Sequence, residues 1–373
     1  MDSYVRSPDA LAEVISAFRR EPLVAVDTEA ASFHKYRDRI YLVQLSTRRA
    51  TAILDPLALP DLAPLGDLLA DRAVEKVFHD ADYDLRILDR DYAFRAARLS
   101  DTRVAAQLAG EAAIGLAALL EKYVHLKVSK EHQKADWSRR PLPASMLAYA
   151  AADTRHLPVL RDALLARLRE LGRLAWAEEE FERLESLRWT GAADGTDAYL
   201  RIKRAKSLTG RQLAALRDLH RWREELAAKQ DRASFRIMGN EALLAVSRAL
   251  PRTRAALAQT PGVPATLLER HEAALLESVR RALALDEKAL PRIERTARVP
   301  RDADFDARVE RLKAARNRVA AELSLDPGVL CGRATLEAVA RVRPNDRAGL
   351  AQVSELRRWQ IQVLGDALLA ALA

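Results

Sequence analysis

Cys331 is the only cysteine in the 373 residues of the chain. A single thiol excludes a disulfide framework and a structural zinc cluster built on thiolates, and it is typical of a reducing compartment. No apolar run approaches the ~18 residues of a membrane-spanning helix, and the first six residues lack the basic start and apolar core of an export signal. We therefore expect a cytoplasmic protein with no membrane partner.

Glycine is also scarce, with 13 residues, and neither of two glycine-rich phosphate-binding motifs, G-x-x-x-x-G-K-[ST] and G-x-G-x-x-G, occurs in the sequence. Their absence disfavours a nucleotide-driven motor and a dinucleotide-dependent oxidoreductase. The composition, 49% hydrophobic and 31% charged, is that of a globular protein. A chain of this length is expected to form two or three domains.

Charge is distributed unevenly along the chain. Residues 1–200 contain 28 Lys and Arg against 32 Asp and Glu, a balance of −4, whereas residues 201–373 contain 33 against 21, a balance of +12. This division indicates that the second half approaches a polyanion and that the first half uses carboxylates. A drift in composition towards Arg and Ala is the alternative explanation.

The first part of the chain is expected to form a mixed β-sheet covered by helices, because short β-branched segments come first and helical patterns follow. The expected strands are 23–26, 40–45, 51–54 and 76–78. The expected helices are 61–70, 83–89, 102–109, 116–124 and one long helix from about 143 to 171.

Small and polar residues interrupt the apolar pattern at 190–197, and every later segment is predicted to be helical. We therefore place a first domain at 1–190, a linker at 191–204 and two all-helical domains at 205–287 and 300–373. Their similar length suggests a tandem, although the two segments show little identity.

Two carboxylates follow the first predicted strand. Asp27 and Glu29 are two residues apart, so they lie on the same side of the strand, where their charges repel unless a cation lies between them. Mg²⁺ prefers oxygen ligands of this kind. Acids also commonly end strands, so the pair alone is a weak signal.

Two further groups carry possible catalytic side chains. Tyr149 and Asp153 are four residues apart on the long predicted helix and therefore share a face, although both could simply cover a core edge or meet solvent. A cluster from His79 to Asp84 follows the fourth strand. Helix capping by Asp82 would also explain this cluster, and His79 is expected to be a structural hydrogen-bonding residue.

The order of these elements resembles the three exonuclease motifs of the D-E-D-D superfamily of 3′→5′ exonucleases. Asp27-x-Glu29 matches the first motif, Asp84 the second and Tyr149-x-x-x-Asp153 the third. The tyrosine subclass is indicated, because Ala148 stands where the other subclass has histidine. The resemblance implies a ribonuclease-H-like fold for the first domain.

Other segments resemble ribonuclease D. They are 41–46, 78–84, 100–102 and 199–203, and residues 219–251 resemble the helical domain (HRDC) shared by helicases and ribonuclease D. The family commonly has an aromatic residue directly after the D-x-E pair. Ala30 stands there in this chain, so Phe33 and His34 are the candidates to stack on a terminal base.

This resemblance implies a metal-dependent 3′→5′ exoribonuclease that releases nucleoside 5′-monophosphates from RNA with an accessible 3′ end, transfer-RNA precursors included. Two Mg²⁺ or Mn²⁺ ions would be held by four carboxylates, and Tyr149 would orient the attacking water. The four carboxylates are Asp27, Glu29, Asp84 and Asp153. A DNA exonuclease acting in repair and an inactive nucleic-acid-binding scaffold are the alternatives.

The densest basic stretch begins in the last residues of the linker and continues into the first helical domain, and it is expected to bind RNA phosphates. The candidate residues are Arg201, Lys203, Arg204, Lys206, Arg211 and Arg221. Intrahelical ion pairs on a solvated face are the competing explanation for this stretch. We expect a monomer.

Overall fold

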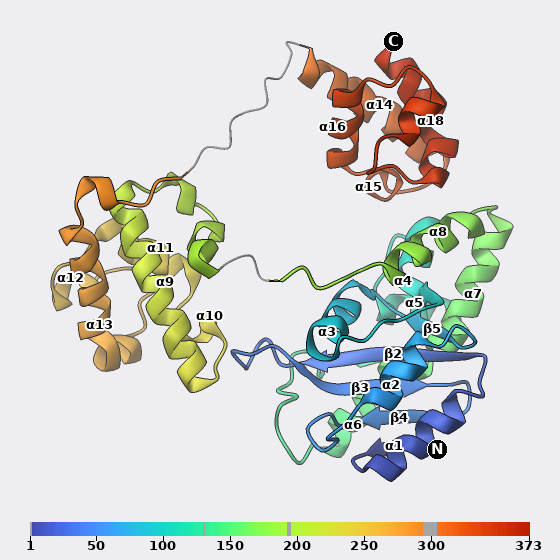
Figure 1. Ribbon diagram of the computed structural model, residues 1–373, viewed down its shortest axis with the longest axis horizontal. Helices are drawn as coiled ribbons and strands as arrows, with labels where there is room; N and C mark the ends of the chain where they lie inside the picture. Colours follow the sequence, from blue (N-terminus) through green and yellow to red (C-terminus); the bar gives the residue numbers. More distant parts are fainter. Residues whose placement is uncertain (1, 130, 192–194, 294–303) are drawn as a thin grey trace. The chain divides into compact units, whose positions relative to one another are not determined.

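The computed structural model describes residues 2–129, 131–191, 195–293 and 304–373. They belong to two compact units, coloured by sequence in Figure 1. Unit 1 comprises Met1–Glu29, Ile40–Trp189 and Arg298–Ala373, and unit 2 comprises Ala30–Arg39 and Thr190–Ala297. No helix of the described residues is long and apolar enough to cross a membrane.

A six-stranded sheet forms the centre of unit 1, with the strand order β1-β4-β3-β2-β5-β6. The strands are β1 (Asp2–Val5), β2 (Leu23–Ala30), β3 (Ile40–Ser46), β4 (Thr51–Leu54), β5 (Glu75–Phe78) and β6 (Leu99–Asp101). β3 and β4 are antiparallel, whereas β1 is parallel to β4 and β5 is parallel to both β2 and β6. The predicted mixed sheet is confirmed, and β1 and β6 are strands that the sequence pattern did not indicate.

Eight helices of the described chain between residues 8 and 185 accompany this sheet. They are α1 (Pro8–Phe18), α2 (Ala63–Ala70), α3 (Asp82–Tyr92), α4 (Thr102–Ala109), α5 (Leu116–Val124), α6 (Ala144–Arg155), α7 (Leu157–Glu170) and α8 (Leu174–Glu185). The long helix expected from 143 to 171 is wrong, because α6 and α7 are separate helices that meet at His156. Pro158 lacks the N–H that would bond the carbonyl of Thr154 in a continuous helix.

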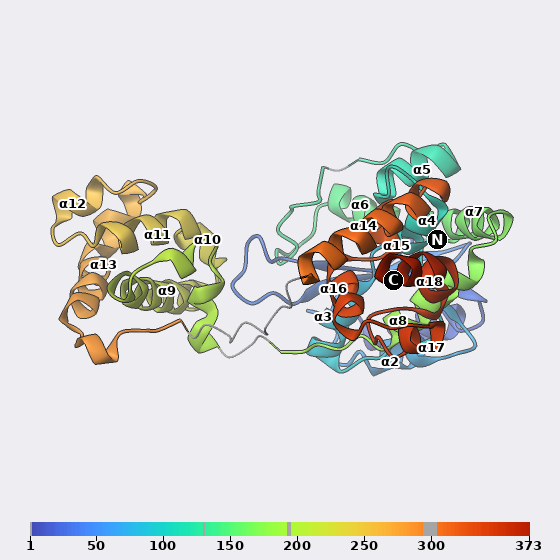
Figure 2. The same cartoon turned by 90° about the horizontal axis from the view of Figure 1, so that it is seen from above.

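A second group of helices in unit 1 packs against α4 and α8, and Figure 2 shows it from above. It contains α14 (Phe305–Glu322), α15 (Pro327–Leu330), α16 (Arg333–Val342), α17 (Arg347–Ala351) and α18 (Arg358–Leu372). Leu108 of α4 and Phe181 of α8 share one hydrophobic core with Leu325 and Trp359. This helical group is therefore a packed part of the nuclease unit.

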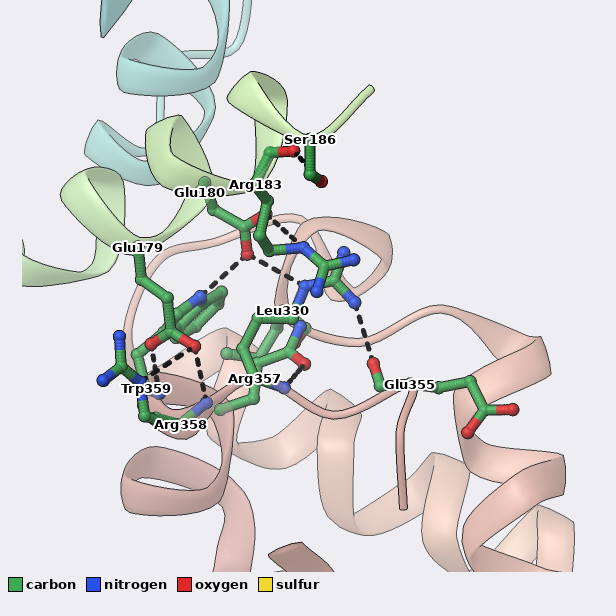
Figure 3. Close-up of polar contacts among 10 residues, drawn as sticks. Glu179, Glu180, Arg183, Ser186, Leu330, Glu355, Arg357, Arg358 and Trp359 are labelled. Atoms are coloured by element: carbon green, nitrogen blue, oxygen red, sulfur yellow. Dashed lines mark hydrogen bonds and ion pairs between the residues drawn. The ribbon is translucent and has the colours of Figure 1, made fainter. Parts of the chain in front are cut away.

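The polar contacts of this junction are drawn in Figure 3. Glu179 accepts hydrogen bonds from the backbone N–H groups of Arg358 at 2.8 Å and Trp359 at 3.1 Å, so a side chain of α8 caps the start of α18. Glu180 accepts from the indole Nε1 of Trp359 at 2.9 Å and from Nε of Arg357 at 3.1 Å. A carboxylate at a helix N-terminus is favourable because the free N–H groups there carry partial positive charge.

Unit 2 has the same order of helices as the group just described. The helices are α9 (Gly210–Gln230), α10 (Ser234–Ile237), α11 (Asn240–Ala249), α12 (Arg254–Ala258) and α13 (Ala265–Ala284), with short 3₁₀ turns at Gly195–Arg201, Ala205–Ser207 and Glu287–Ala289. The second, third and fourth helices have 4, 10 and 5 residues in both groups. In Figure 1, α11 and α13 lie along α9.

Candidate active site

Two carboxylates leave the end of β2 on one side. The strand is fully buried from Leu23 to Val26 and becomes partly exposed at Asp27 and Glu29. The two residues are separated by Thr28, so strand alternation directs both carboxylates the same way. Carboxylate oxygens of Asp27, Glu29 and Asp153 all lie within 4.8 Å of one another.

Helix α6 supplies Asp153 and Tyr149. The buried Ala150 and Ala151 allow this helix to pack closely against β3 and β4, and the hydroxyl of Thr154 lies 2.7 Å from that of Ser46 on β3. The Tyr149 hydroxyl is hydrogen-bonded to the Asp153 carboxylate one turn away. Helical spacing and this anchoring bring both groups to the carboxylates of β2.

The aromatic ring of Tyr149 is held from its other sides. Its centroid lies 5.9 Å from that of His132, edge to face, and 6.2 Å from that of Trp137. These contacts limit the rotation of the ring, so the phenol is presented in one direction.

Asp84 reaches the site from α3. Its side chain is 6% exposed and accepts a short hydrogen bond from the hydroxyl of Thr28, the residue between Asp27 and Glu29. Asp80 and Asp82 instead form exposed ion pairs with Arg103 and Arg86. Of the three aspartates after β5, Asp84 is the one whose charge raises the pKa of Asp27 and of Glu29, although it is not among the three carboxylates that lie within 4.8 Å of one another.

The turn that precedes α3 is held by Asp101 at the end of β6. Its carboxylate accepts hydrogen bonds from the N–H groups of Asp80 at 3.1 Å and Ala81 at 2.7 Å, and it also caps α4. Ala81 is the N-cap residue of α3, which starts at Asp82, and it makes no side-chain cap hydrogen bond, so the interpretation of Asp82 as a cap is wrong. His79 has the structural role expected of it, since its Nδ1 lies 2.9 Å from the Thr102 hydroxyl.

Burial and mutual repulsion make these acids hard to ionise. Burial raises the pKa of Asp84 to about 7 and that of Asp153 to about 7. Burial and the charges of neighbouring carboxylates raise the pKa of Asp27 and that of Glu29 well above their usual values. An all-oxygen, acidic ligand set of this kind suits a hard divalent cation, which removes the repulsion on binding.

The pKa of the Tyr149 phenol is also raised. Burial, followed by the charges of Asp153, Glu29 and Asp27, raises the pKa of Tyr149. The phenol therefore stays protonated at neutral pH and acts as a hydrogen-bond donor, not as a base.

A cavity of about 360 Å³ opens beside Tyr149 and Asp153. Its other walls come from the start of α5, residues 115–118, and from Val128, Ser129 and Gln133. Sequence reasoning did not identify this wall. The one local signal was Gly115, which begins α5 without a side-chain cap and leaves the helix start open.

The predicted RNA-binding residues differ in their surroundings. Arg211 is half-buried and donates to the backbone carbonyls of Leu283 at 2.8 Å and Leu285 at 2.9 Å, so it caps the end of α13. The other five side chains are exposed, and they are Arg201, Lys203, Arg204, Lys206 and Arg221.

Comparisons with known proteins agree with this geometry. A family model described as 3'-5' exonuclease matches residues 3–169, and one described as HRDC domain matches residues 212–279 and 305–372. Ribonuclease D from Gluconacetobacter diazotrophicus is 34% identical over 98% of this chain and 91% of its own length. Ribonuclease D from Escherichia coli is 31% identical over 77% of this chain and 76% of its own.

Solved structures give the same result. The crystal structure of Escherichia coli RNase D, described as an exoribonuclease involved in structured RNA processing, matches with a TM-score of 0.72 and 25% identity over 99% of this chain and 98% of its own. The catalytic core of RRP6 from Trypanosoma brucei matches with a TM-score of 0.67 and 26% identity over 76% of this chain and 81% of its own. The resemblance inferred from the sequence is thus confirmed, and the chain belongs to the ribonuclease D family of 3′→5′ exoribonucleases.

Proposed function

We propose that this enzyme trims the 3′ ends of structured RNA, such as transfer-RNA precursors, and releases nucleoside 5′-monophosphates one at a time. The observation that carries the proposal is the convergence of Asp27, Glu29 and Asp153 within 4.8 Å, with Asp84 close enough to act on Asp27 and Glu29 through its charge. The involvement of the Escherichia coli relative in structured RNA processing supports this choice of substrate.

The four carboxylates are the proposed ligands of two divalent ions, Mg²⁺ or Mn²⁺. Bound between such oxygens, a pair of ions supplies charge stabilisation for the attacking and leaving oxygens of an in-line phosphodiester displacement. The rigid placement of Asp27 and Glu29 on β2 and of Asp153 on α6 fixes the ligand oxygens before substrate arrives. That rigidity favours catalysis because no reorganisation is needed during the reaction.

Tyr149 has a separate role in the proposal. Its protonated phenol is held by Asp153 and by the rings of His132 and Trp137, and it orients the attacking water beside the terminal phosphate. The adjacent cavity of about 360 Å³, walled by residues 115–118, is the proposed space for the terminal nucleotide.

The helical regions are the proposed source of affinity for the rest of the RNA. We assign the exonuclease domain to 1–190, the linker to 191–204 and the two HRDC-type domains to 205–287 and 300–373. Phosphate contacts are assigned to exposed cations of the linker and of the first HRDC-type domain. They are Arg201, Lys203 and Arg204 in the linker and Lys206 and Arg221 in the domain. We place the enzyme in the cytoplasm as a monomer.

The test is degradation of a hairpin RNA with a single-stranded 3′ tail, labelled at its 5′ end, beside a DNA of the same sequence. We expect stepwise shortening from the 3′ end, release of nucleoside 5′-monophosphates and loss of activity when the metal is chelated. Equal degradation of the DNA would favour a repair exonuclease. No product and no Mg²⁺ or Mn²⁺ binding by calorimetry would favour the inactive scaffold.

A further inference from the structure

The loop that follows Glu29 is bound by the first HRDC-type domain. Residues 30–39 belong to unit 2, where the backbone N–H of Ala233 donates to the carbonyl of His34 at 3.2 Å. Lys35 Nζ lies 2.9 Å from the Asp231 carboxylate, and Tyr36 packs on the core of unit 2 and is hydrogen-bonded to Glu224. The loop is thereby fixed on the corner between α9 and α10, residues 231–237.

Two phenyl rings remain on the surface of this corner. Phe33 is 46% exposed and Phe235 is 54% exposed, although their rings touch edge to face with centroids 5.9 Å apart. The two phenylalanines in contact present aromatic surface to solvent, and aromatic faces of this kind are the surfaces on which bases stack. We call this pair the aromatic platform.

The surroundings of the aromatic platform are basic and polar. Arg37 on the loop and Arg232 and Arg236 on the corner are exposed. A cavity of about 340 Å³ next to Phe235 is lined by Lys35 and Asn240 and also by Ser32, Tyr36, Asp38, Arg223, Ala233 and Ser234. Cations beside aromatic rings complement a phosphate backbone with splayed bases, which is how single-stranded RNA is bound.

The short chain between Glu29 and Phe33 limits their separation, whatever the placement of the two units. Phe33 is four residues after Glu29, so their Cα atoms are at most about 14 Å apart at ~3.6 Å per residue. The covalent connection therefore sets an upper limit on the distance from Phe33 to the catalytic residue Glu29.

We propose that Phe33 and Phe235 stack on an unpaired base of the RNA, upstream of the nucleotide being removed, so that the loop after Glu29 and the first HRDC-type domain form one base-binding subsite. This inference rests on the proposed function and adds to it a position at which the enzyme reads single-stranded RNA. The subsite favours a substrate with several unpaired nucleotides at its 3′ end.

The test combines protein and RNA changes in one cycle. Hairpin RNAs whose 3′ tails carry one abasic nucleotide, placed at each of the last six positions in turn, are bound at equilibrium with the metal chelated, so that no cleavage occurs. An abasic nucleotide at one upstream position should weaken RNA binding to the unchanged enzyme by about 5- to 150-fold, which is the range expected for the loss of one base-to-aromatic stack. In the Phe33→Ala, Phe235→Ala double variant, an abasic nucleotide at that position should no longer weaken RNA binding.

Two comparison variants isolate the stacking. Phe235→Leu keeps an apolar side chain without a ring and should lose most of the effect, whereas Val342→Ala, which changes an apolar side chain on α16 that is 53% exposed, should bind as the unchanged enzyme does. Circular dichroism verifies folding. The proposal is overturned if the double variant keeps the same response to abasic positions, or if its only defect is a loss of self-association in sedimentation.

The outcomes also separate this inference from the proposed function. Binding is measured without metal, so an abasic response that depends on the platform can appear in a chain that does not hydrolyse RNA. Conversely, trimming by the double variant with an unchanged preference for tail length would retain the exoribonuclease and refute the subsite.

Discussion

Replacing Asp84 by Asn is expected to abolish trimming and to stabilise the metal-free protein at the same time. Asp84 is 6% exposed, and burial raises the pKa of its carboxyl group to about 7 from an ordinary value of 3.8. Asparagine has nearly the same shape, and its side-chain oxygen can still accept the hydrogen bond from Thr28. The substitution therefore removes mainly the ionisable proton.

The size and sign of the effect follow from proton binding. Because the folded pKa is about 3 units above the ordinary value, and one unit corresponds to 1.36 kcal/mol, the ionised carboxylate destabilises the folded state by at most about 4 kcal/mol. Between about pH 4 and pH 7 the folded state binds more protons than the unfolded state, so the stability of the unchanged protein falls as pH rises through this window. The Asp84→Asn variant has no carboxyl group to ionise at this position, so this fall in stability is absent.

The assay is urea unfolding in the presence of a chelator at several pH values from 4 to 8. The gain of the Asn variant should be near zero at pH 4 and reach a few kcal/mol at pH 8, while RNA trimming with metal is lost. Asp82→Asn is the control, because Asp82 forms an exposed pair with Arg86 and should change stability by less than about 1 kcal/mol and retain activity. Lower stability of the Asp84 variant at pH 8 would show that its ionised form contributes to folding and would refute the reasoning.

Three further substitutions test other parts of the structure. Tyr149→Phe should lower kcat by about 100-fold with metal binding by calorimetry unchanged, because the ring contacts remain and only the orienting phenol is lost; unaltered kcat would remove Tyr149 from catalysis. Trp359→Ala, at a position 2% exposed, should reduce the free energy of unfolding by about 3–5 kcal/mol in urea titrations, and a loss below 1 kcal/mol would contradict tight packing on α8. Replacing Arg201 and Lys203 by Ala should reduce the slope of log affinity against log salt by about 1.4, and an unchanged slope would place the phosphate contacts elsewhere.

The acids of the site could be inferred from the sequence where local geometry decides the outcome. Strand alternation is sufficient to place Asp27 and Glu29 on one side, and helical spacing is sufficient to place Tyr149 beside Asp153. Their convergence on one site involves residues more than a hundred positions apart, which no local period specifies. That step came from the resemblance to a family, whose fold is built from the same order of motifs.

The choice of Asp84 among three aspartates had a local signal. Asp84 lies three and four residues before Ile87 and Leu88, both buried, so it shares the apolar face of α3. Asp82 lies on the exposed side, where it pairs with Arg86. The positions of Asp84 and Asp82 relative to the apolar face of α3 could therefore have identified Asp84 as the site residue without any family resemblance.

Shorter elements were harder to infer. β6 has only three residues, Leu99–Asp101, and its pairing with β5 depends on a partner more than twenty residues earlier. The division of α6 from α7, by contrast, had a clear signal in Pro158, and the alternation of apolar residues on both sides concealed it. Proline therefore outweighs a continuous apolar pattern when the two disagree.

The excess of positive charge in the second half of the chain predicts a polyanionic partner. Part of that excess has an internal role, because several arginines donate to backbone carbonyls. Arg211 binds the carbonyls that end α13, Arg308 that of Ala340 and Arg316 that of Cys331. These guanidinium groups satisfy orphan carbonyls near helix ends and are therefore less available to phosphate.

Another part of the excess balances acids of the nuclease unit itself. The glutamates of α8 follow one another at 178–180 and look like a solvated face in the sequence, yet Glu180 pairs with Arg357 at 3.1 Å and Glu179 lies 3.6 Å from Arg358 (Figure 3). These partners are about 180 residues apart in the chain, beyond the reach of any local pattern. Because Glu179 also occupies the N–H groups at the start of α18, that helix end is closed to phosphate. At this face the second HRDC-type domain is therefore packed against α8 and contributes to the architecture of the nuclease unit.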